Sequence, residues 1–229
     1  MEWIKYHEAE KVFDLRTEHS TYQMQVREYD TLVHLYYGSP VGDTLITDRI
    51  IGVDRGFSGN PYDAGTDRTY SMDSLPQELS CYGNGDFRSA SLMLENGDGS
   101  MSCDMRYKNY TIRDGKYSLP GLPAVYADND EAQTLEIVLE DPATGVEAML
   151  LYGVLPELDI ITRSVYIRNQ SSEKIYVNKV MSAELDFLYG DYDLLTFYGR
   201  HAMERNLQRV PVAHGSQMIG RVRGTSSHQ

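Results

Sequence analysis

The sequence has few of the residues that cross-link a small protein. Its 229 residues include two cysteines, Cys81 and Cys103, and their separation matches no metal-binding or redox motif. A chain of this length removes roughly 70% of its extended-chain surface from water on folding, so it forms a core without disulfides. We therefore expect free thiols in a reducing cytoplasm, and one large domain or two small ones.

Long apolar runs and positive charge are also scarce. No stretch approaches the ~20 apolar residues that cross a membrane, and residues 1–8 lack the apolar centre of a signal peptide. Lys and Arg number 21 against 34 Asp and Glu, which gives a net charge of −13. Because phosphate backbones and anionic lipids attract basic surfaces, we expect neither nucleic acid nor a membrane as a partner.

Motifs for cofactors and catalysis are missing as well. Tyr82–Arg88 holds two glycines but not the third glycine of a dinucleotide loop, and no histidine pair has zinc spacing. Asp128 with Asp130, and Asp191 with Asp193, offer too few oxygens for a calcium loop. No Gly-x-Ser-x-Gly occurs, and the many acids single out no pair for sugar hydrolysis. We expect no metal, no cofactor and no catalytic centre.

The pattern that is present is alternation of apolar and polar residues. It is clearest at 134–140 and 146–152, which flank Asp-Pro-Ala-Thr-Gly at 141–145 and predict an antiparallel hairpin. A second hairpin is expected from 160–168 and 175–188. Arg163 would point inward there among apolar residues, so it requires a buried partner.

Further extended segments are expected at 22–26, 32–37, 87–94 and 101–111, with strong turns between them. Only 200–209 reads as weakly helical. Many short strands joined by glycine-rich turns indicate an all-β sandwich or barrel. Between them, residues 54–78 form a long polar segment that contains aromatic rings, guanidinium groups and carboxylates. Long segments of this kind in compact domains are usually functional or disordered, and the aromatic residues favour an ordered surface for a sugar or a partner.

Two stretches carry a resemblance to a known family. Tyr70-Ser-Met-Asp-Ser-Leu-Pro-Gln-Glu78 followed by Cys81-Tyr-Gly-Asn-Gly-Asp-Phe-Arg88 is similar to a signature of α-galactosidases of glycoside hydrolase family 36. Asp54–Ser58 and Arg223–Gln229 resemble the same family, and the likeness covers essentially the whole chain. It implies an antiparallel β-supersandwich of the galactose mutarotase type.

The resemblance also implies that the catalytic part lies elsewhere. Family members are longer and place two catalytic aspartates on a (β/α)₈ barrel, with a nucleophile after Lys-Trp. Here the only tryptophan is Trp3, which precedes Ile4, so that motif is absent. We expect residues 1–229 to be an N-terminal supersandwich truncated near its C-terminal end. A truncated sandwich exposes strand edges, so we expect a dimer of the fragment or disorder over 200–229.

The resemblance implies a substrate-binding role for one residue, Asp54. In tetrameric bacterial members, an aspartate on an N-terminal loop contacts the terminal galactose in a neighbouring subunit's pocket, and Asp54 best matches that aspartate. A carboxylate is a good acceptor for sugar hydroxyls. The alternative is that Asp54 only pairs with Arg55 or Arg68. Cys81 is expected to be a small packed residue, and Asp86 and Arg88 to pair on one strand face.

The predicted function is therefore that of a structural, oligomerising and pocket-completing domain of a cytoplasmic α-galactosidase, inactive alone, whose parent hydrolyses melibiose- and raffinose-type α-galactosides by retention. A self-standing carbohydrate-binding or assembly module is the alternative. A sugar epimerase with a similar sandwich would need a histidine and a glutamate in one cleft, and His201 and His214 show no such partner in the sequence.

Overall fold

The computed structural model describes residues 2–54, 56, 59–122 and 125–220, and these form two compact units, Met1–Asp186 and Phe187–Gln229. The described residues contain twelve strands and four one-turn 3₁₀ helices. The all-β prediction is confirmed, and the sheets are open, not closed into a barrel. None of the helices described is long and apolar enough to cross a membrane.

The first sheet of unit Met1–Asp186 is an antiparallel meander in the order β1-β2-β3-β4. Its strands are β1 (Ile4–His7), β2 (Val12–Arg16), β3 (Thr21–Val26) and β4 (Leu32–Gly38). A one-turn helix, η1 (Glu28–Asp30), interrupts the chain between β3 and β4. The expected strands at 22–26 and 32–37 are thus confirmed, including the break between them.

The second sheet is also an antiparallel meander, in the order β6-β7-β8-β9. Its strands are β6 (Arg106–Asp114), β7 (Gln133–Glu140), β8 (Val146–Leu155) and β9 (Ile160–Asn169). The β7–β8 hairpin is the one predicted, and Asp141 caps its turn by accepting a bond from Ala143 N at 2.9 Å. A helix η4 (Pro156–Leu158) leads from β8 into β9.

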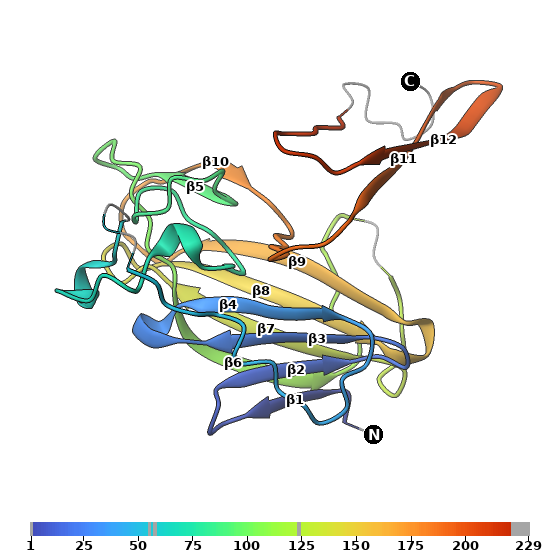
Figure 1. The fold of residues 1–229 in the computed structure, drawn as a ribbon, viewed down its shortest axis with the longest axis horizontal. Coiled ribbons are helices and arrows are strands. Elements are labelled where there is room, and N and C mark those ends of the chain that lie inside the picture. Colours follow the sequence, from blue (N-terminus) through green and yellow to red (C-terminus); the bar gives the residue numbers. More distant parts are fainter. Residues whose placement is uncertain (1, 55, 57–58, 123–124, 221–229) are drawn as a thin grey trace. The chain divides into compact units, whose positions relative to one another are not determined.

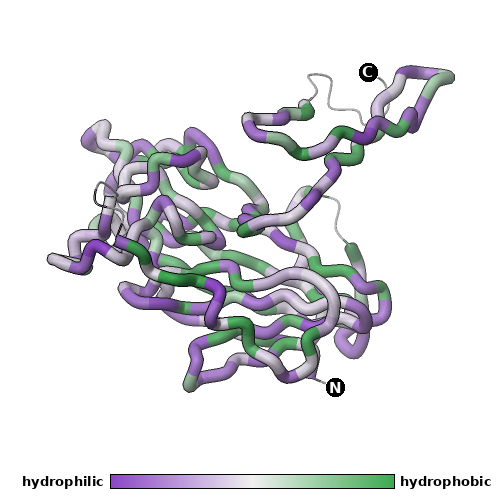
Figure 2. The backbone as a smooth tube through the Cα atoms, in the orientation of Figure 1, coloured by the Kyte–Doolittle hydropathy of each residue, from purple (hydrophilic) through white to green (hydrophobic). Residues whose placement is uncertain are grey.

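The two sheets lie face to face and share one apolar core (Figure 1). Phe13, Met24, Ile137 and Leu150 are fully buried members of this core, two from each sheet. Alternation along each strand supplies the inward face, and the coloured tube shows hydrophobic and hydrophilic residues following one another along these strands (Figure 2). Burial of such side chains stabilises the sandwich by roughly 1.5–3 kcal/mol each.

The predicted hairpin of 160–168 with 175–188 is wrong in its pairing. Strand β9 pairs with β8, whereas β10 (Tyr176–Val180) pairs antiparallel with β5 (Leu92–Glu95). The turn after Asn169 sends the chain away from the second sheet, and the partner strand β5 lies some eighty positions earlier. Residues 181–188 are not in a strand. The segment 87–94 is a strand only from Leu92 onward, and 101–111 only from Arg106.

The second unit is described by itself. It holds a hairpin of β11 (Asp193–Arg200) and β12 (Met203–Pro211), so the prediction of a helix at 200–209 is wrong. Ala202 at the turn and Arg205 in β12 have positive φ angles of 63° and 60°, which a helix does not allow. Residues 203–211 are ordered strand, while 221–229, where disorder was also predicted, lie outside the described residues.

Candidate functional site

A segment of more than fifty residues joins β4 to β5, and it holds nearly all the residues that carried the resemblance. It contains no strand among its described residues, only the helices η2 (Tyr62–Ala64) and η3 (Met72–Ser74). We call described residues 52–71 the acidic arm and residues 81–88 the signature turn. Residues 55, 57 and 58 lie outside the described part of the arm.

The predicted site residue, Asp54, lies on the acidic arm with its side chain 55% exposed. Its Oδ1 atom accepts a hydrogen bond from Gly56 N at 2.9 Å and lies 3.2 Å from Arg68 Nη2. The structure therefore contains the predicted ion pair with Arg68, while Arg55 is not among the residues described. Both contacts found among the described residues use the same oxygen, Oδ1.

The acidic arm folds back on itself through polar contacts. Asn60 Nδ2 donates to Asp67 O at 2.6 Å, and Met72 N donates to Gly59 O at 3.2 Å. Asp67 in turn accepts bonds from the backbone and hydroxyl of Thr69, which lower its pKa. These bonds give the arm a defined shape without strands. Apolar packing adds to them, because Ala64 and Tyr70 of the arm are buried against Val33 and Leu35 of β4.

The arm also presents apolar surface. Tyr62 is 97% exposed and Val53 is 57% exposed. Beside Tyr62, the carboxylate of Asp63 pairs with Arg106 on β6 at 2.6 Å, and Asp104 pairs with the same guanidinium. The arm therefore carries two exposed apolar side chains, and the Asp63–Arg106 pair attaches it to β6 beside one of them.

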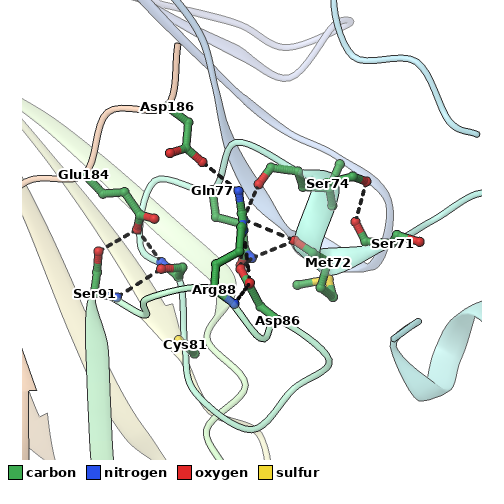
Figure 3. A network of polar contacts seen from close by, with 12 residues as sticks. Ser71, Met72, Ser74, Gln77, Cys81, Asp86, Arg88, Ser91, Glu184 and Asp186 are labelled. Carbon is green, nitrogen blue, oxygen red and sulfur yellow. Dashed lines mark hydrogen bonds and ion pairs between the residues drawn. The ribbon is translucent and has the colours of Figure 1, made fainter. Parts of the chain in front are cut away.

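The signature turn is held by Arg88, whose guanidinium reaches three segments (Figure 3). It binds the buried Asp86 carboxylate in a two-pronged pair of 3.0 and 2.8 Å, and Nη2 also donates to Leu75 O at 2.8 Å. Its third nitrogen, Nη1, donates to Asp186 Oδ2 at 3.0 Å. The expected Asp86–Arg88 pair is confirmed, but it lies in a turn and not on a strand. A bidentate arginine fixes both distance and orientation.

One glutamine and one glutamate side chain complete the attachment of this region. Gln77 Nε2 donates to Asp86 Oδ2 at 2.9 Å, and Glu184 Oε2 accepts from Ser80 N and Ser91 Oγ (Figure 3). Cys81, the first residue of the signature turn, is buried and its Sγ contacts Leu79 O, so its predicted packing role is confirmed. Both cysteines are buried and free.

A second carboxylate, Glu78, lies between the two sheets on the side of β4 and β9, with 0% exposure. Its Oε1 accepts a 2.6 Å bond from Tyr22 on β3 and lies 3.3 Å from His34 Nδ1 on β4. Its Oε2 accepts a 2.6 Å bond from Tyr152 on β8 and lies 3.2 Å from Arg163 Nη1 on β9. The inward-pointing Arg163 thus has the buried acidic partner that the sequence required.

We call Glu78 and its partners Tyr22, His34, Tyr152 and Arg163 the Glu78 centre. Its carboxylate is ionised at neutral pH. Burial alone raises the pKa of Glu78, but the charge of Arg163 and the bond with His34 outweigh burial and lower it to about 2. Burial and the neighbouring Glu78 charge raise the pKa values of Tyr22 and Tyr152 well above the ordinary value. The Glu78 carboxylate therefore stays ionised and both phenols stay protonated at neutral pH.

Sequence reasoning did not single out Glu78, Tyr22 or Tyr152 as one cluster. The available signal was Arg163 on an apolar strand face, because a buried guanidinium implies a buried acid. That rule names the residue type but not its position. Glu78 follows an irregular segment, and only the folded backbone places it between the two sheets. Across the described residues, no group of three or more His, Cys, Asp or Glu side chains could hold a metal ion.

Known proteins resemble this chain in sequence and in fold. Residues 30–229 match the glycosyl hydrolase family 36 N-terminal domain. The chain is 54% identical over 227 residues to the bifunctional α-galactosidase/sucrose kinase AgaSK of Mediterraneibacter gnavus, covering 99% of this chain and 24% of that protein.

Solved structures agree. The galactosidase domain of AgaSK superposes with a TM-score of 0.94, covering 99% of this chain and 31% of that one. A family 36 α-galactosidase, AgaA from Geobacillus stearothermophilus in complex with raffinose, gives a TM-score of 0.90 at 39% identity, covering 96% of this chain and 30% of that one. The chain thus spans less than a third of these relatives, and it belongs to the glycosyl hydrolase family 36 N-terminal domain family.

Proposed function

We propose that this chain is the structural, oligomerising and pocket-completing N-terminal domain of an α-galactosidase that removes terminal α-linked galactose from oligosaccharides of the melibiose and raffinose type. The proposal is supported by the family membership and by relatives that are themselves α-galactosidases, one of them solved with raffinose. The catalytic barrel would lie in a part of the parent protein outside these 229 residues. The two buried thiols suit a reducing compartment such as the cytoplasm.

The observation that carries the pocket-completing role is the environment of Asp54. Its carboxylate is exposed and is oriented through Oδ1 by Gly56 and Arg68. In this proposal Oδ2 accepts the bond from a sugar hydroxyl. A hydrogen bond to a charged acceptor is roughly twice as strong as a neutral one. An oriented carboxylate at an exposed position is suited to contact the galactose bound in another subunit of a homotetramer.

The oligomerising role is supported by the surface around Asp54. Val53 and Tyr62 present apolar area on the same arm, and the Asp63–Arg106 pair fixes the arm near Tyr62. A subunit that binds this surface would cover the apolar side chains and place its pocket against Asp54. The buried Glu78 is unsuited to be a catalytic acid, because both of its oxygens are occupied by protein donors.

The test is a kinetic comparison in the complete enzyme. Asp54→Asn keeps the size of the side chain and removes its charge, so we expect kcat/KM for a chromogenic α-galactoside to fall by about 10- to 100-fold, since loss of one charged hydrogen bond removes roughly 1.5–3 kcal/mol. Asp48→Asn, which removes the same charge from an exposed position of the same segment, is the matched control and keeps wild-type kinetics.

Unchanged kinetics of the Asp54→Asn enzyme would contradict the pocket-completing role. A separate binding measurement addresses the alternative module. Titration of the 229-residue chain alone with melibiose is expected to give no binding, and saturable binding by the chain alone would favour a self-standing carbohydrate-binding domain.

A further inference from the structure

The acidic arm and the signature turn meet backbone to backbone at two glycines. A Cβ atom added at Gly59 would lie 2.6 Å from Gly85 Cα and 2.7 Å from Gly85 O, whereas ordinary contact starts near 3.4 Å. Gly85 also has a φ of 80°, which favours glycine on its own. Gly59 does not have a positive φ angle. Glycine is needed there because of the close approach to Gly85.

Gly59 is connected to Asp54 through the fold of the arm. Its neighbour Asn60 donates to Asp67 O at 2.6 Å. Arg68, which follows Asp67, pairs with Asp54 at 3.2 Å. The carbonyl of Gly59 is held by Met72 N at 3.2 Å. A displacement of Gly59 is therefore passed to the pair that orients the Asp54 carboxylate.

Gly85 is connected to the sandwich through the signature turn. Tyr82 N donates to Leu92 O on β5 at 3.2 Å, and Tyr82 O accepts from Cys103 N at 3.1 Å. One residue after Gly85, the buried Asp86 is held by Arg88 and Gln77. The turn is thus a fixed base, and the arm is the part that would move if the two glycines were forced apart.

We infer that the Gly59–Gly85 contact sets the position of Asp54, which makes both glycines positioning residues for galactoside binding. The inference rests on the proposed function, in which the Asp54 carboxylate contacts the sugar. It adds that the glycine contact holds this carboxylate in position. An alanine at Gly59 would separate the arm from the turn by about 1 Å. A displacement of that size at a substrate contact can lower a rate constant by up to ~100-fold.

Gly59→Ala in the complete enzyme tests the inference by kinetics and by structure. We expect KM for a chromogenic α-galactoside to rise about tenfold, with a smaller change in kcat, and the crystal structure to show the Asp54 Cα displaced by roughly 1 Å. Gly220→Ala adds the same methyl group where no atom of the described residues lies within 4 Å, and it keeps wild-type KM. A Gly59→Ala enzyme with unmoved Asp54, or with moved Asp54 and wild-type KM, would overturn the inference.

A second variant keeps the test decisive if Gly59→Ala does not fold. Arg88→Lys retains the positive charge but loses the two-pronged contact that holds the turn, so KM is expected to rise in the same direction by a few-fold while kcat is retained. Wild-type KM in folded Arg88→Lys enzyme would also count against the inference. The proposed function fails separately, through wild-type kinetics of Asp54→Asn, and in that case the crystal position of Asp54 alone decides whether the contact positions it.

Discussion

The Asp54 and Glu78 carboxylates belong to the same long segment but have opposite environments. Glu78 is fully buried, and donors from four strands of two sheets occupy its oxygens. Asp54 is 55% exposed, and its contacts among the described residues occupy one oxygen only. The comparison shows that one segment can place two acids in very different surroundings. We propose a ligand-binding role only for Asp54, the acid that is exposed.

The largest effect on stability is expected from removing the buried carboxylate of Glu78. Glu78→Ala leaves Arg163 buried without its acid and removes the acceptor of two phenols, so we expect the free energy of unfolding of the chain to fall by about 3–5 kcal/mol. Urea unfolding followed by circular dichroism measures this. A loss under about 1 kcal/mol would show that the Glu78 centre does not hold the sheets together.

The next effect is a pH dependence specific to Glu78. Its pKa is lowered from an unfolded value of 4.5 to about 2, so its ionisation stabilises the fold above pH 4.5, and this stabilisation, about 3 kcal/mol, is lost as pH falls from 4.5 towards 2. The stability difference between the wild type and Glu78→Gln should therefore shrink over that interval. A difference that stays constant with pH would contradict the ionised state of Glu78.

A smaller effect is expected from the partner of Asp54. The Asp54–Arg68 pair is more than half exposed on both sides, and such pairs contribute at most about 1 kcal/mol. Arg68→Gln in the complete enzyme should raise KM by less than about fivefold, and 0.5 M NaCl should reduce the difference from the wild type because salt screens exposed charges. A loss of activity larger than that of Asp54→Asn would show that Arg68 itself contacts the substrate.

The smallest effect is expected on stability at Asp54. Because the side chain is exposed and has few protein contacts, Asp54→Asn should change the free energy of unfolding by no more than about 0.5 kcal/mol. Thermal or urea unfolding beside Glu78→Ala gives the comparison directly. A loss similar to that of Glu78→Ala would assign Asp54 a structural role.

Local features of the fold were predictable from the sequence, and distant pairings were not. The β7–β8 hairpin follows from alternation around a Pro- and Gly-containing turn, all within about twenty residues. The pairing of β10 with β5 depends on contacts some eighty positions apart, which no local pattern reports. The β11–β12 turn places Ala202 at positive φ, and an alanine at that position does not signal a turn.

In the candidate site, too, some features could be predicted from the sequence and others could not. The need of Arg163 for a buried acid could be predicted from one strand, because burial of an unpaired charge is costly. Its identity as Glu78 could not, since Glu78 lies outside any regular element. The Gly59–Gly85 contact joins two irregular segments, so the close approach of these glycines becomes visible only in the folded structure.

The most direct test of the central claim, that Asp54 serves the pocket of a neighbouring subunit, is a subunit-mixing assay. Asp54→Asn subunits, which keep an intact catalytic barrel, are co-expressed with subunits whose barrel nucleophile is inactivated but whose Asp54 is intact. If Asp54 acts on a neighbour, mixed oligomers contain complete sites, and kcat/KM rises well above that of either parent enzyme. Activity no higher than the average of the two parents would contradict the account, because it would mean that Asp54 and the nucleophile must belong to the same chain.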